Sequence, residues 1–576
     1  MKWLAFLALS GCSLYIGDDK PAPGTPGAEP WGAPITGGTM LVTRDDTRAV
    51  VADPDRDRIV VLDLTTEQIV NTFTLDPGSQ PGRIAEDGAG RLHVALRGSG
   101  QLATISGDSI VLSPVCGEPR GVAWEESTDL VHVACATGEL VSVPAGGGDA
   151  VRVLRLDRDL RDVIVRPTGL TVTTFRRPEL IDVDATGTAI TRQKLPPLGF
   201  IDQVTAQPDV AWRTIALPDG RLLMSHQLRV MKGLSTQPGG YGESSMPCRN
   251  KTIESSLTVV GTDGTLMPVM PVVFGALPVD VAVNPAQTQV AVVTAGSRAV
   301  KVFAASSINN GDKGDCTEDD SAREVPAVAG VAGSPTSVAW RASGELLVFY
   351  PESSSLLIVG RGLVSLGGAP GSDLGRTLFH RQTAVGMACA SCHPEGRDDA
   401  QVWTFDGIGA RRTQNISGGV LARAPFHWNG DMKDLPMLVD TVFVQRMSGG
   451  MASDDETRAL GYWLDRLPAP RGVVADPDAV LRGEELFSSP ELGCRSCHNG
   501  DQLTNTALVN VGTGGTMKVP SLIGVGARAP YLHSGCAQTL TDRFTLASCG
   551  GGDYHGHTSQ LSQAELADLV AYLESL

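Results

Sequence analysis

Two strings in the last third of this 576-residue chain have the residue types and the spacing needed to attach heme covalently. Each reads Cys-x-x-Cys-His; the first consists of Cys389, Cys392 and His393, and the second of Cys494, Cys497 and His498. Two cysteines at this spacing can form thioether bonds with both vinyl groups of one porphyrin, and the residue that follows can place its imidazole at the iron. The sequence therefore predicts two covalently bound heme c groups, with the two histidines as iron ligands.

A structural zinc site bound by the four motif cysteines is the alternative, because such sites also use paired cysteines. Zinc leaves unexplained why a histidine follows each pair directly. It also ignores the helix that is expected some distance after each pair. We therefore favour heme.

Six further cysteines remain once the two motifs and Cys12, near the N-terminus, are set aside. An even remainder in an exported protein indicates disulfide bonds. The expected pairs are Cys116–Cys135 and Cys536–Cys549, which are local, and Cys248–Cys316, which would join two loops. Free buried thiols are the alternative.

The N-terminus has the pattern of a bacterial export signal. Lys2 precedes a short apolar stretch, and Leu9-Ser10-Gly11-Cys12 then resembles the lipobox of bacterial lipoproteins. We expect residues 1–11 to be a signal peptide, Cys12 to be lipidated, and residues 12–36, rich in Pro and Gly, to form a tether. The protein is then expected in the periplasm or at the cell surface, anchored to a membrane by lipid without a transmembrane helix.

The composition is that of a globular protein with an acidic balance. Charged residues make up 19% of the chain and hydrophobic residues 42%, and the formal net charge is -17. This charge argues against nucleic acid as a partner, because phosphates need basic groups. The acidity fits a soluble exported protein, and docking to a basic redox partner protein is the second interpretation.

Residues 37–362 are predicted to form an all-β domain, because short apolar runs alternate with turn residues and helical periodicity is missing. A degenerate Pro-x-x-Ile/Val-Ala motif starts at Pro81, Pro119, Pro278 and Pro335. The first two copies start 38 residues apart, and the third follows after 159, about four such units. The domain resembles the YVTN-type β-propeller family, which implies about seven blades in a closed ring. The ligand of such a propeller cannot be read from the sequence.

Two polar insertions, at 233–256 and 306–324, interrupt the repeat and contain Cys248 and Cys316. They either shape a binding face or are tolerated surface loops, and we favour the second interpretation.

After residue 362 the chain changes from strand patterns to helices and loops. A linker at 367–372 leads into two predicted cytochrome c domains, 363–470 and 471–576, each with one motif. The spacing predicts helices at 453–467, 476–487 and 562–576. Capping boxes start the first and third of these helices, formed by Ser453 with Glu456 and by Ser562 with Glu565; Asp476 is the N-cap of the second. The fold class is therefore multidomain: an all-β propeller followed by a mostly α diheme module.

Three strings in the C-terminal third resemble the bacterial diheme cytochrome c peroxidase and MauG-type superfamily. They are Phe-His-Trp-Asn-Gly-Asp at 426–431, Val-Pro-Ser-Leu at 519–522 and Ala-Pro-Tyr-Leu-His-Ser-Gly at 529–535. The resemblance implies that Trp428 lies between the hemes and assists electron transfer, with a packed core tryptophan as the alternative. It also implies that His533 lies beside the second heme, near the interface between the two units, where hydrogen bonding is favoured over iron ligation.

The chain departs from this superfamily at two positions. Its peroxidases carry a glutamate just before a methionine in a segment that reads Gln445-Arg446-Met447 here, without an acid. Ala547 stands where members carry a methionine or tyrosine as distal ligand of the second heme. These departures put peroxidase activity in doubt.

The sixth iron ligands are open at this point. His427 is the expected ligand of the first heme, with Met432 and Met447 as rivals; His555 is the expected ligand of the second, with His557 and Met517 as rivals. An open or water-bound position on one heme is the alternative, and an enzyme that reduces peroxide or oxygen needs one.

Three functions follow from these patterns. The first is a redox enzyme of peroxide or oxygen chemistry, the second an electron-transfer protein with two six-coordinate irons, and the third a binding protein whose propeller docks a partner. The substrate cannot be read from the sequence.

Overall fold

The computed structural model describes residues 32–188, 190–199, 205–242, 251–267, 270–272, 275–310 and 321–576. Cys12, the lipobox, Cys248 and Cys316 lie outside the described residues, so the predicted lipidation and the third disulfide stay predictions. Among the described residues, no helix has both the length and the apolar character needed to cross a membrane.

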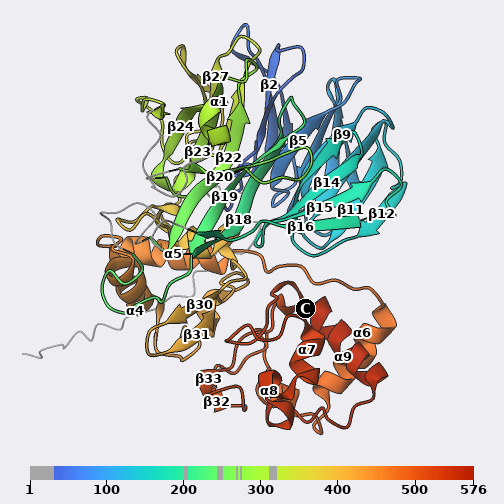
Figure 1. Ribbon diagram of the computed structural model, residues 1–576, viewed down its shortest axis with the longest axis vertical. Coiled ribbons are helices and arrows are strands. Elements are labelled where there is room, and N and C mark those ends of the chain that lie inside the picture. Colours follow the sequence, from blue (N-terminus) through green and yellow to red (C-terminus); the bar gives the residue numbers. More distant parts are fainter. Residues whose placement is uncertain are drawn as a thin grey trace, which may run out of the picture.

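Seven antiparallel sheets form the N-terminal part of the chain, as expected for a seven-bladed propeller (Figure 1). Blade 1 contains β1 (Met40–Val42), β2 (Arg48–Asp53), β3 (Arg58–Asp63) and β4 (Gln68–Thr74). Blade 2 contains β5 (Pro81–Glu86), β6 (Leu92–Leu96), β7 (Gln101–Ser106) and β8 (Ser109–Pro114). Blade 3 contains β9 (Pro119–Glu125), β10 (Leu130–Cys135), β11 (Glu139–Pro144) and β12 (Arg152–Arg155). Blade 4 contains β13 (Leu160–Arg166), β14 (Gly169–Thr174), β15 (Glu179–Asp184) and β16 (Ile190–Lys194).

The remaining three blades include the irregular one. Blade 5 contains β17 (Leu198–Gly199), β18 (Thr205–Ala216), β19 (Leu222–Val230), β20 (Ile253–Val260) and β21 (Met270–Pro271). Blade 6 contains β22 (Pro278–Val283), β23 (Gln289–Thr294), β24 (Ala299–Ala304) and β25 (Arg323–Glu324), with the short helices η1 (Ala295–Ser297) and α1 (Ala305–Asn310). Blade 7 contains β26 (Ser337–Trp340), β27 (Leu346–Tyr350), β28 (Ser355–Ile358) and β29 (Gly362–Ser365).

The repeated Pro motif marks the inner strands of the ring. Pro81, Pro119 and Pro278 begin β5, β9 and β22, and Pro335 precedes β26 by two residues. The strands β1, β5, β9, β13, β18, β22 and β26 each contact the next, and β26 contacts β1. The predicted count of four units between Pro119 and Pro278 is wrong, because the interval holds three steps, from β9 to β13, β18 and β22. The 12-residue β18 and the insertion that follows β19 lengthen blade 5.

The ring closes between blade 1 and blade 7 without exchanging a strand, since both sheets use consecutive strands. The backbone N–H of Thr39 donates to Ser337 Oγ at 2.7 Å across this seam. Leu62 of blade 1 and Phe349 of blade 7 belong to one buried apolar cluster. Closure gives every blade two neighbours, and a single sheet could not bury both faces alone.

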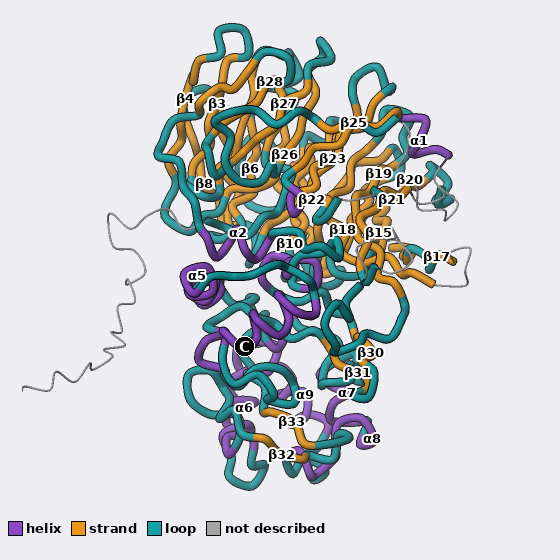
Figure 2. Tube along the Cα trace, turned by 90° about the vertical axis from the view of Figure 1, so that its left-hand side faces the viewer, coloured by secondary structure: helices purple, strands orange, loops and turns teal. Residues whose placement is uncertain are grey.

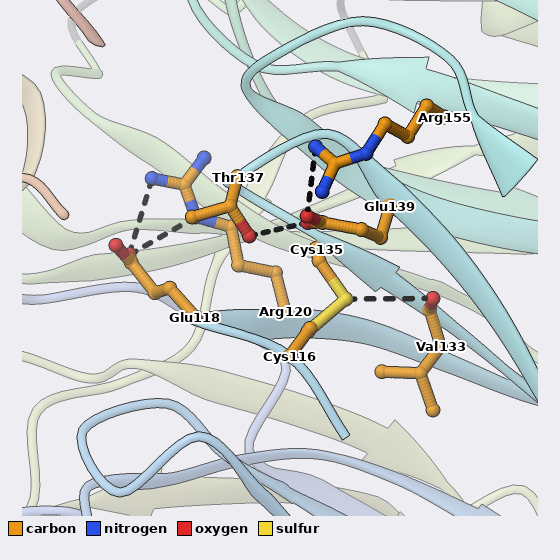
Figure 3. The surroundings of a disulfide bond; sticks show 8 residues. All are labelled: Cys116, Glu118, Arg120, Val133, Cys135, Thr137, Glu139 and Arg155. Atoms are coloured by element: carbon orange, nitrogen blue, oxygen red, sulfur yellow. Dashed lines mark hydrogen bonds and ion pairs between the residues drawn. A yellow bond between two sulfur atoms is a disulfide. The ribbon is translucent and has the colours of Figure 1, made fainter. Parts of the chain in front are cut away.

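Two of the three predicted disulfides are present. Cys116–Cys135 joins the segment before β9 to the end of β10, and Cys536–Cys549 lies in the C-terminal region. Figure 3 shows the first of them beside Glu118 and Arg120.

A C-terminal region with several helices follows the propeller, and we call residues 366–470 its first unit and 471–576 its second unit. The first unit contains α2 (Leu374–His380), α3 (Cys389–Cys392), η2 (Pro394–Gly396), β30 (Val402–Phe405), β31 (Gly409–Arg412), η3 (Val420–Arg423), α4 (Leu435–Leu438), the π-helix η4 (Val439–Arg446) and α5 (Asp454–Asp465). The second unit contains α6 (Pro477–Ser488), η5 (Cys494–Ser496), β32 (Leu508–Asn510), β33 (Thr516–Lys518), η6 (Val525–Ala527), α7 (Leu540–Thr545), α8 (Ala547–Gly550), η7 (Gly552–His555) and α9 (Gln563–Ser575).

The three predicted helices are present with their caps. Ser453 and Glu456 form the capping box of α5, Ser562 and Glu565 form that of α9, and Asp476 caps α6. The predicted apolar face of α5, consisting of Leu460, Trp463, Leu464 and Leu467, is fully buried.

The first unit packs directly on the propeller. Figure 2 shows α2 and α5 between the blades and the second unit, and Figure 1 shows α5 in the same place. One buried apolar cluster contains Phe175 and Trp212 of the propeller together with Phe379 and Trp463 of the first unit. Because the two parts share this closely packed core, the C-terminal region is held in one position against the propeller.

The hydroxyl of Ser337 satisfies a buried N–H at the ring seam, so its removal tests how the ring closes. We expect Ser337→Ala to destabilise the propeller by about 1–3 kcal/mol, because the Thr39 N–H loses its acceptor. Chemical unfolding followed by tryptophan fluorescence measures this. Ser109→Ala, at an exposed position of β8, is the control and should change stability by less than about 0.5 kcal/mol. Equal effects of the two variants would contradict the importance of this contact.

Candidate cofactor cavity

One continuous cavity of about 650 Å³ lies within the C-terminal region and reaches the propeller. Its wall includes all six residues of the two Cys-x-x-Cys-His motifs. The volume is in the range of small-molecule and cofactor sites. The fold therefore brings together two motifs that stand 105 residues apart in the sequence.

The first motif occupies a short helix that the core holds in place. Cys389 and Cys392 are the ends of α3, and Ala390 between them is completely buried. Nδ1 of His393 lies 3.0 Å from the carbonyl oxygen of Arg397, and the ring also interacts with the backbone of Gln414. Burial lowers the pKa of His393 and favours the neutral imidazole that binds metals.

The second motif has the same local arrangement. Cys494 begins η5, and Cys497 follows it. Nδ1 of His498 lies 3.1 Å from the carbonyl oxygen of Leu503, and the ring also interacts with the backbone of Pro520. Burial lowers the pKa of His498 to about 4. Both histidines are thus neutral near pH 7, with one nitrogen held by the backbone.

His555 faces His498 across the cavity. The two ring centroids are 6.4 Å apart and the ring planes are tilted by 35°. Imidazoles on opposite sides of one metal have centroids about 6–6.5 Å apart, from bonds of about 2.0–2.1 Å plus about 1.2 Å from nitrogen to ring centre on each side. Nδ1 of His555 lies 3.2 Å from the carbonyl oxygen of Gly550. The separation of the two rings matches that value.

The predicted ligands of the first centre are placed differently. His427 lines the cavity, but a third of its side chain is exposed, and its Nδ1 lies 3.1 Å from Asp431 Oδ1. Met447 also lines the cavity, whereas Met432 packs in the apolar core. In the second unit, His557 and Met517 line the cavity in addition to His555.

Trp428 and His533 meet at the boundary between the two units. Their ring centroids are 6.2 Å apart in an edge-to-face arrangement. Trp428 Nε1 donates to the carbonyl oxygen of Arg412 at 2.7 Å, and the Arg412 N–H donates to the carbonyl oxygen of His533 at 2.6 Å. Both side chains line the cavity, so the predicted relay residue and the predicted heme neighbour lie in contact between the motifs.

The cavity wall is rich in cationic side chains. They are Arg411, Arg412, Arg423, Arg446, Lys518, Arg528 and Arg543. The acidic residues of the same wall are Asp431 and Asp553. Nε of Arg412, Nε of Arg446 and Nη1 of Arg543 are buried without a hydrogen-bond partner in the described part of the chain. Burial lowers the pKa of Lys518 to about 8, as expected for a desolvated ammonium. Such a wall fits an anionic ligand, and the two carboxylates of a heme are of this kind.

The propeller contributes part of this wall, which sequence reasoning missed. Leu234, Thr236 and Tyr241, from the insertion after β19, and Thr252 line the cavity. The Leu234 N–H donates to Thr404 at 2.8 Å and the Tyr241 N–H to Arg446 at 3.2 Å, both at carbonyl oxygens of the first unit. The favoured interpretation of this insertion as a surface loop is therefore wrong for its described part. Its single tyrosine beside two glycines gave no signal of a cavity wall.

A second feature that the sequence did not indicate is a pair of buried carboxyl groups. Asp209 lies in β18, and Asp399 follows the first motif; both are completely buried. Gln401 bridges them, because its Nε2 donates to Asp209 Oδ1 and its N–H donates to Asp399 Oδ1, each at 2.9 Å. Burial raises the pKa of Asp399 to about 6 and raises the pKa of Asp209 well above its usual value, where the Asp399 charge adds to the effect.

The arrangement does not support the zinc alternative. Within the described ranges, no group of three or more His, Cys, Asp or Glu side chains converges in a way that could hold a metal ion. The four motif cysteines are thiols that line one cavity rather than corners of one tetrahedron.

Comparison with known proteins gives a limited result. No family model matches the chain. The chain is 27% identical to hydrazine synthase subunit gamma of Kuenenia stuttgartiensis, in a match that covers 33% of this chain and 72% of that protein. A hydrazine synthase structure from the same organism covers 58% of this chain and 98% of its own, with 14% identity and a TM-score of 0.45. Virginiamycin B lyase from Staphylococcus aureus covers 55% and 92%, with 11% identity and a TM-score of 0.38.

The seven-bladed propeller is defined by the strand pairing of this chain. The proteins named above include no cytochrome family, so membership of the diheme peroxidase superfamily stays a prediction.

The buried carboxyl pair predicts a stability that depends on pH. The folded-state pKa of Asp399 is higher than that of an unfolded aspartate, so the folded protein binds more protons between about pH 4 and pH 6. Stability therefore falls as the pH rises through this window, and the loss is complete above it. We expect Asp399→Asn to raise stability at pH 8 by about 1–3 kcal/mol and to have a smaller effect below pH 4.

Thermal unfolding at several pH values measures this difference. Asp149→Asn, at an exposed propeller turn, is the control and should follow the unmodified protein at every pH. A gain for Asp399→Asn that is as large at pH 4 as at pH 8 would rule out titration of the pair as its cause.

Proposed function

We propose that this protein is an exported diheme c-type cytochrome whose C-terminal region carries out electron transfer, with a reactive first centre. The observation that carries this proposal is that both Cys-x-x-Cys-His motifs line one cavity with unpaired buried guanidinium nitrogens. In this proposal Cys389 and Cys392 attach the first heme, and Cys494 and Cys497 attach the second. His393 and His498 are the histidine ligands, held by their backbone contacts.

The second centre is proposed to be closed. His555 stands opposite His498 at a centroid distance that suits one metal between two imidazoles. Two histidine ligands give a lower potential than a histidine with a methionine, and a closed iron suits electron transfer rather than substrate binding. Bound heme supplies an iron that accepts and donates single electrons.

The first centre is the proposed site of reaction. His427 remains at the cavity rim, where its contact with Asp431 can hold and move a proton at Nδ1. Tyr241 and Arg446 form another polar part of the wall, since the Tyr241 hydroxyl interacts with the Arg446 guanidinium. The absence of an acid at Gln445-Arg446-Met447 favours a reaction other than the glutamate-assisted cleavage of peroxide. Trp428 and His533, in contact between the units, are the proposed route for electrons.

A non-catalytic conduit is the second candidate, in which His427 closes the first centre. Its exposed position and its contact with Asp431 favour the open form. In either case a lipid anchor at Cys12, a place in the periplasm or at the cell surface and a redox partner protein complete the proposal. Nucleic acid is not a proposed partner, given the net charge of -17.

Covalent heme attachment is the direct test of the proposal. We expect the mature protein to keep its colour after denaturation and to contain two hemes per chain. Cys494→Ser with Cys497→Ser should leave one heme, because removing both thiols of a pair removes both of its thioether bonds. Heme staining of denaturing gels and the absorbance of the alkaline pyridine complex give the counts. Cys536→Ser with Cys549→Ser, which opens a disulfide, is the control and should keep both; a colourless chain contradicts the proposal.

Carbon monoxide distinguishes an open centre from a closed one. We expect the reduced protein to bind one carbon monoxide per chain, at the first centre, as measured by absorbance titration. His555→Ala should raise the number to two because it removes the sixth ligand of the second centre, whereas His557→Ala should leave it at one. No binding by the unmodified protein would favour the conduit, and an unchanged number in His555→Ala would contradict His555 as a ligand.

A further inference from the structure

Glu395 has an unusual position for a charged residue. It lies two residues after His393, in η2 (Pro394–Gly396), and is 4% exposed. Its φ of +55° is in the left-handed region, which costs free energy for a residue with a side chain. The rest of the structure must therefore hold it there.

Arginines from three consecutive propeller blades hold the Glu395 carboxylate. Oε1 is 2.5 Å from Arg161 of blade 4, and Oε2 is 2.6 Å from Arg97 of blade 2 and 3.4 Å from Arg120 of blade 3. Arg120 and Arg161 belong to the inner strands β9 and β13, and Arg97 follows β6. The side chain of Glu395 thus enters the inner part of the ring, where three of its blades meet.

A second carboxylate, that of Glu118, connects the same arginines to the loop that follows the first motif. Glu118 is 3.3 Å from both Arg97 and Arg120, and its other oxygen is 2.8 Å from Arg397 of the first unit. Figure 3 shows the Glu118 side chain turned toward Arg120, next to the disulfide that fixes this segment. The loop is therefore bound by ion pairs at both Glu395 and Arg397.

The propeller also binds the motif on the other side of the histidine. Gln227 of β19 donates from Nε2 to the carbonyl oxygen of Ser391 at 2.8 Å. Ser391 lies two residues before His393 and Glu395 two residues after it. Both contacts are buried, and in both of them the partner side chains belong to the propeller. The position of His393 is consequently fixed by the propeller rather than by the first unit alone.

We propose that Glu395 is a positioning residue of the first redox centre and that the propeller is thereby a structural part of this centre rather than only a platform for a partner. This inference rests on the proposed function, because it needs His393 to ligate an iron. Glu395 acts through His393 and through its negative charge, which balances arginines close to the centre.

The negative charge of Glu395 determines the direction in which the midpoint potential of the first centre should change. Glu395→Gln keeps the shape of the side chain but leaves the three arginines without this counter-charge. Added positive charge favours the reduced iron, so the midpoint potential of the first centre should rise, while that of the second centre should stay unchanged. Glu395→Asp keeps the charge and should restore most of the potential.

Spectroelectrochemical titration of the holoprotein, with heme counted in the same samples, tests this. Glu126→Gln, an exposed change of the same chemistry in the propeller, is the control and should shift neither potential. The expected result is a positive shift confined to the first centre in Glu395→Gln, with recovery in Glu395→Asp. Equal potentials in Glu395→Gln and the unmodified protein, or equal shifts of both centres, overturn the inference.

The heme count separates this failure from failure of the proposed function, because an unmodified protein without covalent heme refutes the function itself. Should Glu395→Gln not accumulate, Gln227→Ala takes its place; it removes the contact with Ser391 together with the acceptor of the Trp212 Nε1–H. It should then alter the potential of the first centre and not that of the second. No change in Gln227→Ala, with both hemes present, would also overturn the inference.

Discussion

Charge that is taken out of water must be paired, and this requirement determines how the C-terminal region sits on the ring. Burial alone would raise the pKa of Glu395, but Arg97, Arg161 and Arg120 hold it well below its usual value. Arg176 of the propeller shows the same principle. It pairs with Asp159 at 2.7 Å and with Asp398 of the first unit at 3.0 Å, and it donates to Ala527 of the second unit at 2.9 Å. One guanidinium thus joins the propeller and both units.

Such ion pairs affect both the stability of the protein and the relative orientation of its parts. A buried ion pair adds little net stability compared with apolar packing, but the loss of one partner leaves an uncompensated charge and is costly. Alternative orientations of the two halves would leave several of these groups unpaired at once. The ion pairs therefore select one arrangement, and the shared apolar core around Trp212 and Trp463 supplies the attraction.

The sequence predicted the features that depend on neighbouring residues. The repeated Pro motif located four inner strands, the capping boxes of α5 and α9 were read directly, and two local disulfides were paired by proximity. Motif spacing alone selected the six Cys-x-x-Cys-His residues that line the cavity. The sequence offered His555 as a partner of His498 only with His557 and Met517 as alternatives, because residue spacing gives no distance between side chains.

Features built from distant segments could not be predicted. Arg161 and Glu395 are 234 residues apart, and either one alone reads as an ordinary surface charge. Asp209 appears in a strand pattern and Asp399 in a polar loop, with no signal that they share Gln401. Tyr241 belongs to an insertion whose composition is typical of exposed loops. In each case the decisive quantity is the approach of two elements in space.

The way the C-terminal region crosses the ring seam has a consequence for dissection of the molecule. Arg56, in the turn before β3, and Arg58, the first residue of β3, donate to the carbonyl oxygens of Ala369 and Gly367, just after blade 7. Trp463 of α5 donates to the carbonyl oxygen of Gly32, and Arg376 of α2 pairs with Asp55. These contacts join the C-terminal region to blade 1 and to the segment before it, across the junction of the first and last blades. A shortened chain that ends with blade 7 would lose these contacts and expose Phe175 and Trp212, which the first unit covers in the intact protein. Such a chain would therefore not represent the propeller of the intact protein.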